Sequence, residues 1–134
     1  MDIVLRTNCE DPCLALRNVQ RFGDGSGFGG FLRVRSRGFA AERPFYVEPE
    51  PLLSFLEAVE RMDRTLTGSA LLKPLFEDHF IQLHLDHAGR ATIRGELLEY
   101  SASPQHLCFQ FETDQTCRAP LAADLRACLQ LPVS

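Results

Sequence analysis

Two different spacings of apolar residues run along the chain, and the change from one to the other predicts its elements. Between Phe31 and Arg37 and between His79 and Asp86, apolar and polar residues alternate, which is typical of strands with one buried face. Glycine, asparagine and aspartate residues between such segments indicate tight turns that join antiparallel neighbours. Further strands are expected over Ile3 to Thr7, Cys13 to Gln20, Phe39 to Val47, Ala70 to Leu75, Arg90 to Tyr100 and Leu107 to Glu112.

Two other segments repeat their apolar residues at helical spacing. The first helix is expected from Pro51 to Arg64, after prolines and carboxylates that suit a helix start, and the second from Pro120 to Leu131. The chain is therefore predicted to be one α+β domain over residues 1–134, an antiparallel sheet of about seven or eight strands with two amphipathic helices. We expect the helix residues Leu52, Phe55, Leu56, Val59, Leu121 and Leu125 to be buried against the sheet residues Leu83, Ile93, Phe109 and Phe111.

Length and charge narrow the functional classes. The chain has 134 residues, the usual size of one domain, and a net charge of -4. An acidic chain does not gain the phosphate attraction that drives nonspecific nucleic-acid binding, so no nucleic-acid partner is expected. The first residues lack the features of a signal peptide, and no stretch has the roughly 18 apolar residues of a membrane span. We therefore expect a cytoplasmic protein without a membrane partner.

The five cysteines predict reduced thiols rather than a metal centre or a disulfide. Cys9 and Cys13 are four positions apart in an expected turn, but metal sites usually combine such a pair with a second pair. Cys108, Cys117 and Cys128 are spread over an expected strand, a loop and a helix. No metal site and no cofactor are predicted.

The sequence contains no recognisable catalytic motif. The glycine-rich segment from Gly23 to Gly30 lacks the Gly-Lys-Ser/Thr ending of a phosphate-binding loop and precedes a strand instead of a helix. Ser26 lies between glycines, but not at the spacing of a nucleophile elbow. The segment is expected to be a flexible hairpin loop, and no catalytic residue is assigned.

The sharpest polar pattern is a basic row. Arg33, Arg35 and Arg37 occupy alternate positions and are expected to share the outer face of one strand. Such a row either keeps a sheet from associating with other chains or binds an acidic partner. We expect these arginines to pair with carboxylates of neighbouring strands. The candidate carboxylates are Glu42, Asp86, Glu96 and Glu112.

An ordered set of short strings extends from about Phe31 to Leu131. The strings are Phe45-Tyr46-Val47-Glu48, Leu66-Thr67-Gly68-Ser69-Ala70-Leu71, Arg94-Gly95-Glu96-Leu97 and Phe109-Gln110-Phe111-Glu112-Thr113-Asp114-Gln115-Thr116. In this order the chain resembles the WapI-type bacterial immunity proteins and related small bacterial domains of unknown function. The resemblance implies a protein that binds and neutralises a toxin made by the same cell, and it assigns no contact residue.

The sequence thus predicts a noncatalytic protein-binding domain, with an immunity protein as the specific case. Its acidic balance suits a basic toxin, since opposite charges speed encounter. The predicted contact residues surround the first helix and are Glu48, Glu50, Glu57 and Glu60. Two alternatives stay open: a small enzyme with a cleft between the sheet and the Gly23–Gly30 loop, and a structural module that forms homo-oligomers.

Overall fold

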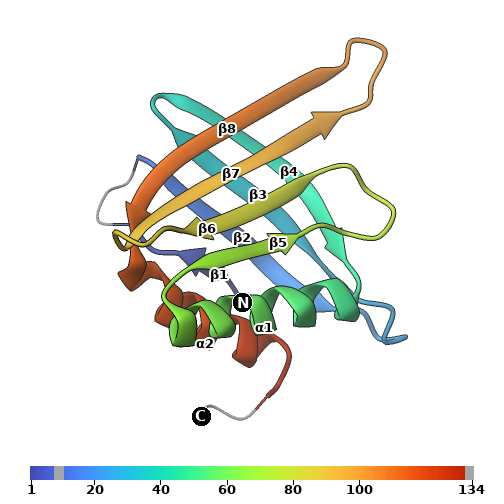
Figure 1. Cartoon of the computed structure of the whole chain (residues 1–134). Helices are drawn as coiled ribbons and strands as arrows, with labels where there is room; N and C mark the ends of the chain where they lie inside the picture. The colour runs from blue at the N-terminus through green and yellow to red at the C-terminus, as the bar shows by residue number, and fades with distance from the viewer. Residues whose placement is uncertain (8–10, 132–134) are drawn as a thin grey trace.

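The computed structural model describes residues 1–7 and 11–131, and their strands and helices fall into two similar halves (Figure 1). Each half consists of four consecutive strands followed by a helix. The first half contains β1 (Ile3–Leu5), β2 (Cys13–Arg21), β3 (Phe28–Ser36), β4 (Phe39–Val47) and α1 (Pro49–Thr65). The second half contains β5 (Gly68–Leu72), β6 (Phe80–Leu85), β7 (Arg90–Glu99), β8 (Gln105–Asp114), the 3-10 turn η1 (Gln115–Cys117) and α2 (Arg118–Cys128).

The eight strands formed by the described residues divide into two antiparallel sheets of four strands each. Sheet A has the order β1-β2-β3-β4, and sheet B has the order β5-β6-β7-β8. The predicted α+β class, the antiparallel pairing and the number of strands are confirmed, with the strands shared between two sheets instead of one. Pro44 lies in β4 at the edge of sheet A, where a missing N–H removes no hydrogen bond from the sheet interior.

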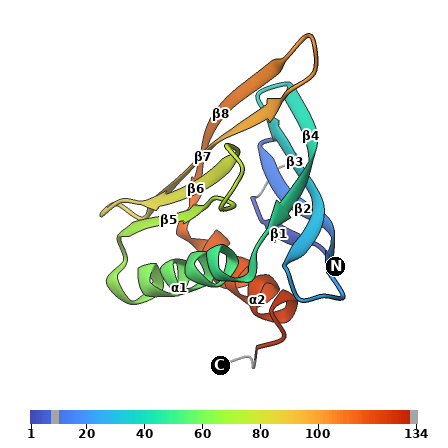
Figure 2. The same ribbon diagram turned by 90° about the vertical axis from the view of Figure 1, so that its right-hand side faces the viewer.

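The two sheets face each other through their apolar sides, with both helices at one end. Figure 2 shows the sheets approaching each other near the β3–β4 and β7–β8 hairpins and spreading apart toward α1 and α2. Contacts join β3 to β8 and β4 to β7 across this approach. α1 packs on β5, α2 packs on β1, and the helices contact each other, so that together they close the wide end.

The hydrophobic core lies between the sheets and the helices and takes residues from every strand. All ten residues predicted to form it are buried, from Leu125 at 0% exposed to Phe109 at 7%. The two sheets and both helices also surround one void of about 20 Å³, close to the size of one water molecule. Because each sheet buries its apolar face against the other, neither half has a complete core by itself.

The ends of the helices follow from local sequence. Glu48 is the N-cap residue of α1, and a proline follows it in the first turn, where a missing N–H leaves no gap in the helix. At the other end Leu66 adopts a left-handed conformation with φ 60°, and its N–H donates to the carbonyl oxygen of Met62. The sequence prediction extends α2 too far, to Leu131 instead of Cys128. None of the helices in the described ranges combines the length and the apolar character that a membrane span needs.

Gly95 marks a close packing in sheet B that admits no side chain. A Cβ atom at this position would lie 2.4 Å from the carbonyl oxygen of Phe80 and 2.7 Å from the ring of Phe109. We expect Gly95→Ala to lower the free energy of unfolding by about 1–3 kcal/mol, the usual cost of overpacking a filled core. Urea denaturation followed by far-ultraviolet circular dichroism measures this change.

Gly23→Ala is the matched control for this prediction. Gly23 lies in the β2–β3 hairpin, and a Cβ atom there would have no neighbour within 4 Å. Its substitution should change the free energy of unfolding by less than about 0.5 kcal/mol. Equal unfolding midpoints for Gly95→Ala and the wild-type chain would contradict the described packing.

Candidate binding surfaces

The outer face of sheet A carries three arginines on the adjacent strands β2 and β3. The strand register places Arg33 opposite Ala15 and Arg17 opposite Phe31, and Arg35 follows two positions after Arg33. Because alternate residues of a strand point to opposite faces, these side chains all point away from the core. The small side chain of Ala15 leaves a shallow hollow of about 240 Å³ among the three arginines.

Exposed aromatic rings extend this surface along β3 and β4. Phe31 is 42% exposed, Tyr46 is 52% exposed and Phe22 is 38% exposed. Tyr46 lies opposite Gly29, and the ring of Phe22 packs over Gly29 with its centroid 6.1 Å from that of Tyr46. Aromatic rings beside guanidinium groups are typical of protein interfaces. We call this surface the arginine face; it consists of Arg17, Arg33, Arg35, Phe22, Phe31 and Tyr46.

The guanidinium groups of Arg33 and Arg35 have no ion-pair or hydrogen-bond partner within residues 1–7 and 11–131. Arg17 reaches Asp2 only at 4.0 Å. The predicted pairing with carboxylates is therefore wrong. Glu42 lies opposite Arg33 without forming an ion pair, and the other candidates lie in sheet B or its turns because the strands divide into two sheets. These other candidates are Asp86, Glu96 and Glu112.

Arg37 is not on the arginine face, although the sequence pattern predicts it there. β3 ends at Ser36, and Arg37 lies in the turn to β4 with φ 53°. The backbone N–H groups of Arg37 and Gly38 donate to the two carboxylate oxygens of Asp11 at 2.7 and 2.8 Å. The turn therefore removes the third member of the basic row from the strand.

The four carboxylates predicted as contact residues around α1 do not form one open acidic surface. Glu60 accepts hydrogen bonds at 2.7–2.9 Å from Nε and Nη2 of Arg126, and this ion pair joins α1 to α2. Glu48 accepts a hydrogen bond at 3.0 Å from a backbone N–H in the loop after β5. Glu50 and Glu57 are exposed. Half of the predicted contact residues thus make bonds inside the molecule.

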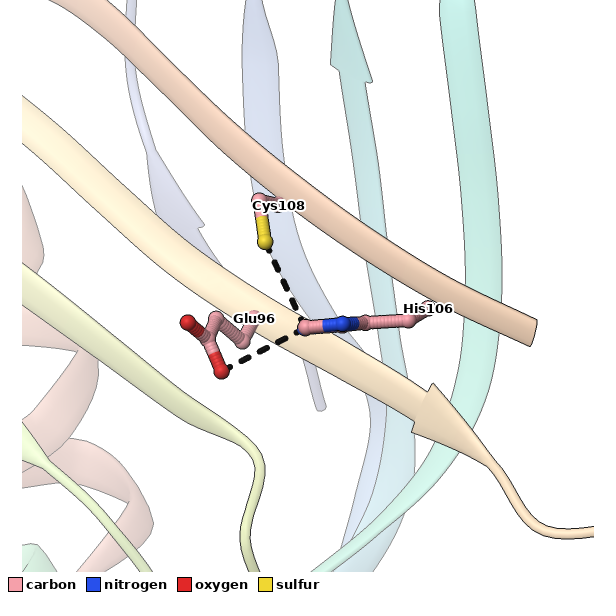
Figure 3. A group of neighbouring side chains, drawn as sticks. All are labelled: Glu96, His106 and Cys108. Carbon is pink, nitrogen blue, oxygen red and sulfur yellow. Dashed lines mark hydrogen bonds and ion pairs between the residues drawn. The ribbon is translucent and has the colours of Figure 1, made fainter. Parts of the chain in front are cut away.

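Three side chains that can bind a metal ion meet on the outer face of sheet B (Figure 3). Glu96 of β7 lies opposite Cys108 of β8, and His106 precedes Cys108 by two positions on the same face. The Nε2 atom of His106 lies 3.3 Å from the sulfur of Cys108 and 3.4 Å from Oε2 of Glu96. All three ligand atoms lie within 4.8 Å of one another.

A hollow of about 260 Å³ borders this cluster. It is lined by Phe80, Arg94 and Gln110 together with Glu96 and Cys108. The guanidinium group of Arg94 lies 5.8 Å from the centroid of the Phe80 ring, and its Nε donates to a side-chain oxygen across the β6–β7 pair at 2.8 Å. These contacts hold a positive charge beside the cluster.

Sequence reasoning misses this cluster because it looks for metal ligands through the spacing of the cysteines alone. The spacing of His106 and Cys108 was an available signal, since two positions along a strand share one face. Glu96 is ten positions before His106, and only the pairing of β7 with β8 brings it to the cluster.

The segment from Gly23 to Gly30 is a hairpin turn that continues directly into a strand. The N–H of Gly25 donates to the carbonyl oxygen of Phe22 at 3.1 Å, and the N–H of Phe22 donates to that of Gly27 at 2.9 Å. β3 begins at Phe28. The void beside this segment measures about 10 Å³ and has an apolar lining, so it has no room for a substrate.

The described cysteines are free thiols with very different access. Cys9, one member of the predicted Cys9 and Cys13 pair, lies outside the described residues. Cys108 is exposed, whereas Cys117 and Cys128 are buried. Burial raises the pKa of the Cys117 thiol to about 11 and also raises the pKa of the Cys128 thiol. Both buried thiols are therefore protonated at neutral pH.

Thiol reactivity should follow this difference. Under native conditions at mildly alkaline pH, iodoacetamide should alkylate Cys108 at least about tenfold faster than Cys117 and Cys128, because the thiolate is the nucleophile. Peptide mass spectrometry after short exposures gives the rate for each cysteine. In denaturant the three rates should become similar, and a native Cys117 rate equal to that of Cys108 would contradict the described burial.

Asp114-Gln115-Thr116 is one of the strings on which the resemblance to WapI-type immunity proteins is based, and it lies at the end of sheet B. The hydroxyl of Thr116 donates to Oδ1 of Asp114, and the N–H of Thr116 donates to the same oxygen at 2.8 Å. These two hydrogen bonds lower the pKa of Asp114. The side chain of Gln115 lies beside Gly89 in the β6–β7 turn. The string therefore shapes the passage from sheet B into α2.

Comparison with known proteins gives a likeness of fold. No protein-family model matches the chain, and no curated protein matches it. Among solved structures, the chain is similar to the crystal structures of MRP1/MRP2 from Trypanosoma bruciei, with a TM-score of 0.55 and 12% sequence identity. The match covers 97% of this chain and 83% of that chain. The likeness thus extends over both halves of the fold and concerns the fold alone.

Proposed function

We propose that this chain is a noncatalytic protein-binding domain that acts as an immunity protein in the bacterial cytoplasm and neutralises a toxin by binding it. The arginine face is the observation that carries the proposal. Exposed aromatic rings lie there beside Arg33 and Arg35, whose guanidinium groups have no ion-pair or hydrogen-bond partner among residues 1–7 and 11–131. Arginine and aromatic residues contribute most to protein interfaces, and a hydrogen-bonded sheet loses little entropy when a partner binds.

The resemblance to WapI-type immunity proteins supplies the partner class, a toxin made by the same cell. The arginine face is a better candidate surface for that toxin than the acidic residues around α1. Glu48 and Glu60 already bond within the molecule, which leaves Glu50 and Glu57 as a secondary contact.

The distribution of charge indicates the chemistry of the partner surface. Residues 1–47, which include the four strands of sheet A, contain seven arginines and five acidic residues and so carry a charge of +2. Residues 48–134 contain seven basic and thirteen acidic residues and carry -6, which together with the first part gives the net charge of -4. We infer that the partner is acidic where it meets the arginine face. The net charge of the whole chain alone would instead favour a basic partner, but the local charge of the arginine face determines which surface it contacts.

Reversing two charges on the arginine face should abolish protection from the toxin. Co-expression of the wild-type chain with the toxin encoded beside its gene should restore bacterial growth. Arg33→Glu combined with Arg35→Glu should weaken binding by roughly 100-fold or more, because attraction at the contact becomes repulsion. Colony counts and calorimetric titration of the purified pair measure the two effects.

The matched control is Arg61→Glu combined with Arg64→Glu. These exposed arginines lie on α1, outside the arginine face, and their reversal changes the net charge equally. This variant should keep protection and an affinity within about threefold of wild type. If both double variants protect equally well, the arginine face is not part of the interface with the toxin. A wild-type chain that gives no protection from the neighbouring toxin would refute the immunity function.

Single-stranded nucleic acid is the second candidate partner, since exposed rings beside arginines also suit stacked bases. We propose that it is not the ligand. The net charge is -4, and residues 48–134 carry -6, so phosphate groups meet repulsion from most of the molecule.

A fluorescein-labelled oligothymidine tests this second candidate. At physiological salt its anisotropy should show no saturable change below about 10 μM protein. The opposite result has a clear signature on the same variants. Oligothymidine binding would then fall steeply with salt, disappear in the Arg33→Glu, Arg35→Glu variant and persist in the Arg61→Glu, Arg64→Glu variant. That result would identify nucleic acid, and not a protein, as the ligand of the arginine face.

A further inference from the structure

We propose that Glu96, His106 and Cys108 bind a zinc ion on the outer face of sheet B. They offer a carboxylate oxygen, an imidazole nitrogen and a sulfur, the ligand types that Zn²⁺ takes in proteins. The site is independent of the arginine face, which lies on the other sheet. The proposal replaces the sequence prediction of no metal, which rests on the spacing of the cysteines.

The distances within the cluster fit tetrahedral coordination. Zinc bonds of about 2.0–2.3 Å at tetrahedral angles place neighbouring ligand atoms about 3.3–3.8 Å apart. Nε2 of His106 lies 3.3 Å from the sulfur of Cys108 and 3.4 Å from Oε2 of Glu96. The third distance is within 4.8 Å, and the Glu96 side chain is 39% exposed, so it has room to rotate toward the sulfur.

Hydrogen bonds satisfy this cluster only in part. The sulfur of Cys108 and a carboxylate oxygen of Glu96 both lie against the same nitrogen of His106. In a neutral imidazole that nitrogen either donates one hydrogen or accepts one. A zinc ion accepts a lone pair from all three atoms at once. On binding, the Cys108 thiol releases its proton to water, and His106 carries its proton on Nδ1.

The backbone holds the three ligands in place before any metal binds. Two of them lie on β8, and the third lies on its paired neighbour β7, within a ladder that runs from Arg90 opposite Asp114 to Glu99 opposite Gln105. Ligands on paired strands are positioned more accurately than ligands on loops. Because the core is complete without the ion, zinc binding at this exposed site is reversible and is not required for folding.

Three protein ligands leave one of the four tetrahedral positions open. The hollow of about 260 Å³ borders both Glu96 and Cys108, and Arg94 is among the residues that line it. The fourth ligand is therefore water or an anionic group, such as a carboxylate, that Arg94 attracts. Glu96, His106 and Cys108 can bind the ion whichever of these groups is the fourth ligand.

Metal titration of the purified, reduced and untagged chain tests the site. Calorimetry with Zn²⁺ should give one ion per chain. Co²⁺ should produce the near-ultraviolet charge-transfer absorption of a thiolate–cobalt bond, together with the strong visible bands of tetrahedral geometry. Cys108→Ser should remove the charge-transfer absorption and weaken zinc binding at least about tenfold. His106→Asn and Glu96→Gln should weaken it in the same direction.

Cys13→Ser is the matched control, because Cys13 is a partly accessible free thiol on sheet A, away from the cluster. This variant should keep the absorption band and the zinc affinity of the wild-type chain. Circular dichroism checks that each variant is folded. If Cys108→Ser does not fold, the zinc affinities of His106→Asn and Glu96→Gln test the proposal. A wild-type chain without saturable zinc uptake would overturn the proposal, as would a charge-transfer band that persists in Cys108→Ser.

Discussion

The burial of two apolar sheet faces against each other is the interaction on which the rest of this structure depends. A four-stranded sheet with one apolar face leaves that face in contact with water unless another element covers it, and here each sheet covers the other. Leu32 of sheet A and Ile93 of sheet B are both completely buried. The sheets diverge toward one end, so the apolar stripes of α1 and α2 are needed to exclude water there, and the Glu60–Arg126 ion pair joins the two helices.

This arrangement leaves polar chemistry to the outer faces of the sheets. Every second residue of a strand is committed to the core, while its neighbours can vary without disturbing the fold. The two halves use this freedom differently. Sheet A presents arginines and aromatic rings, and sheet B presents Glu96, His106 and Cys108. One architecture, used twice, thus carries two chemically distinct surfaces.

The division of the strands into two sheets also decides the electrostatics. The predicted pairing with Asp86, Glu96 or Glu112 requires the basic strand of the first half to lie beside the carboxylates of the second half. The structure instead places Arg33 and Arg35 on the outer face of sheet A, and Glu96 and Glu112 on the outer face of sheet B. Glu112 pairs with Arg90 of its own sheet at 3.8 Å. The arginines therefore keep their charge available for another molecule.

The sequence by itself determined the order and type of the elements and the residues of the core. A period of two or of about 3.6 residues is a local property, because each segment must bury one face. It identified α1 and all ten predicted core residues, from Leu52 to Leu125, correctly. The tertiary structure decided which strands share a sheet. It thereby separated Arg33 from Glu112 and brought Glu96 to Cys108. Which strand pairs with which depends on contacts between segments that are separate in the sequence. Alternating apolar residues look the same in every strand, so the pattern within one strand does not identify its neighbour in the sheet.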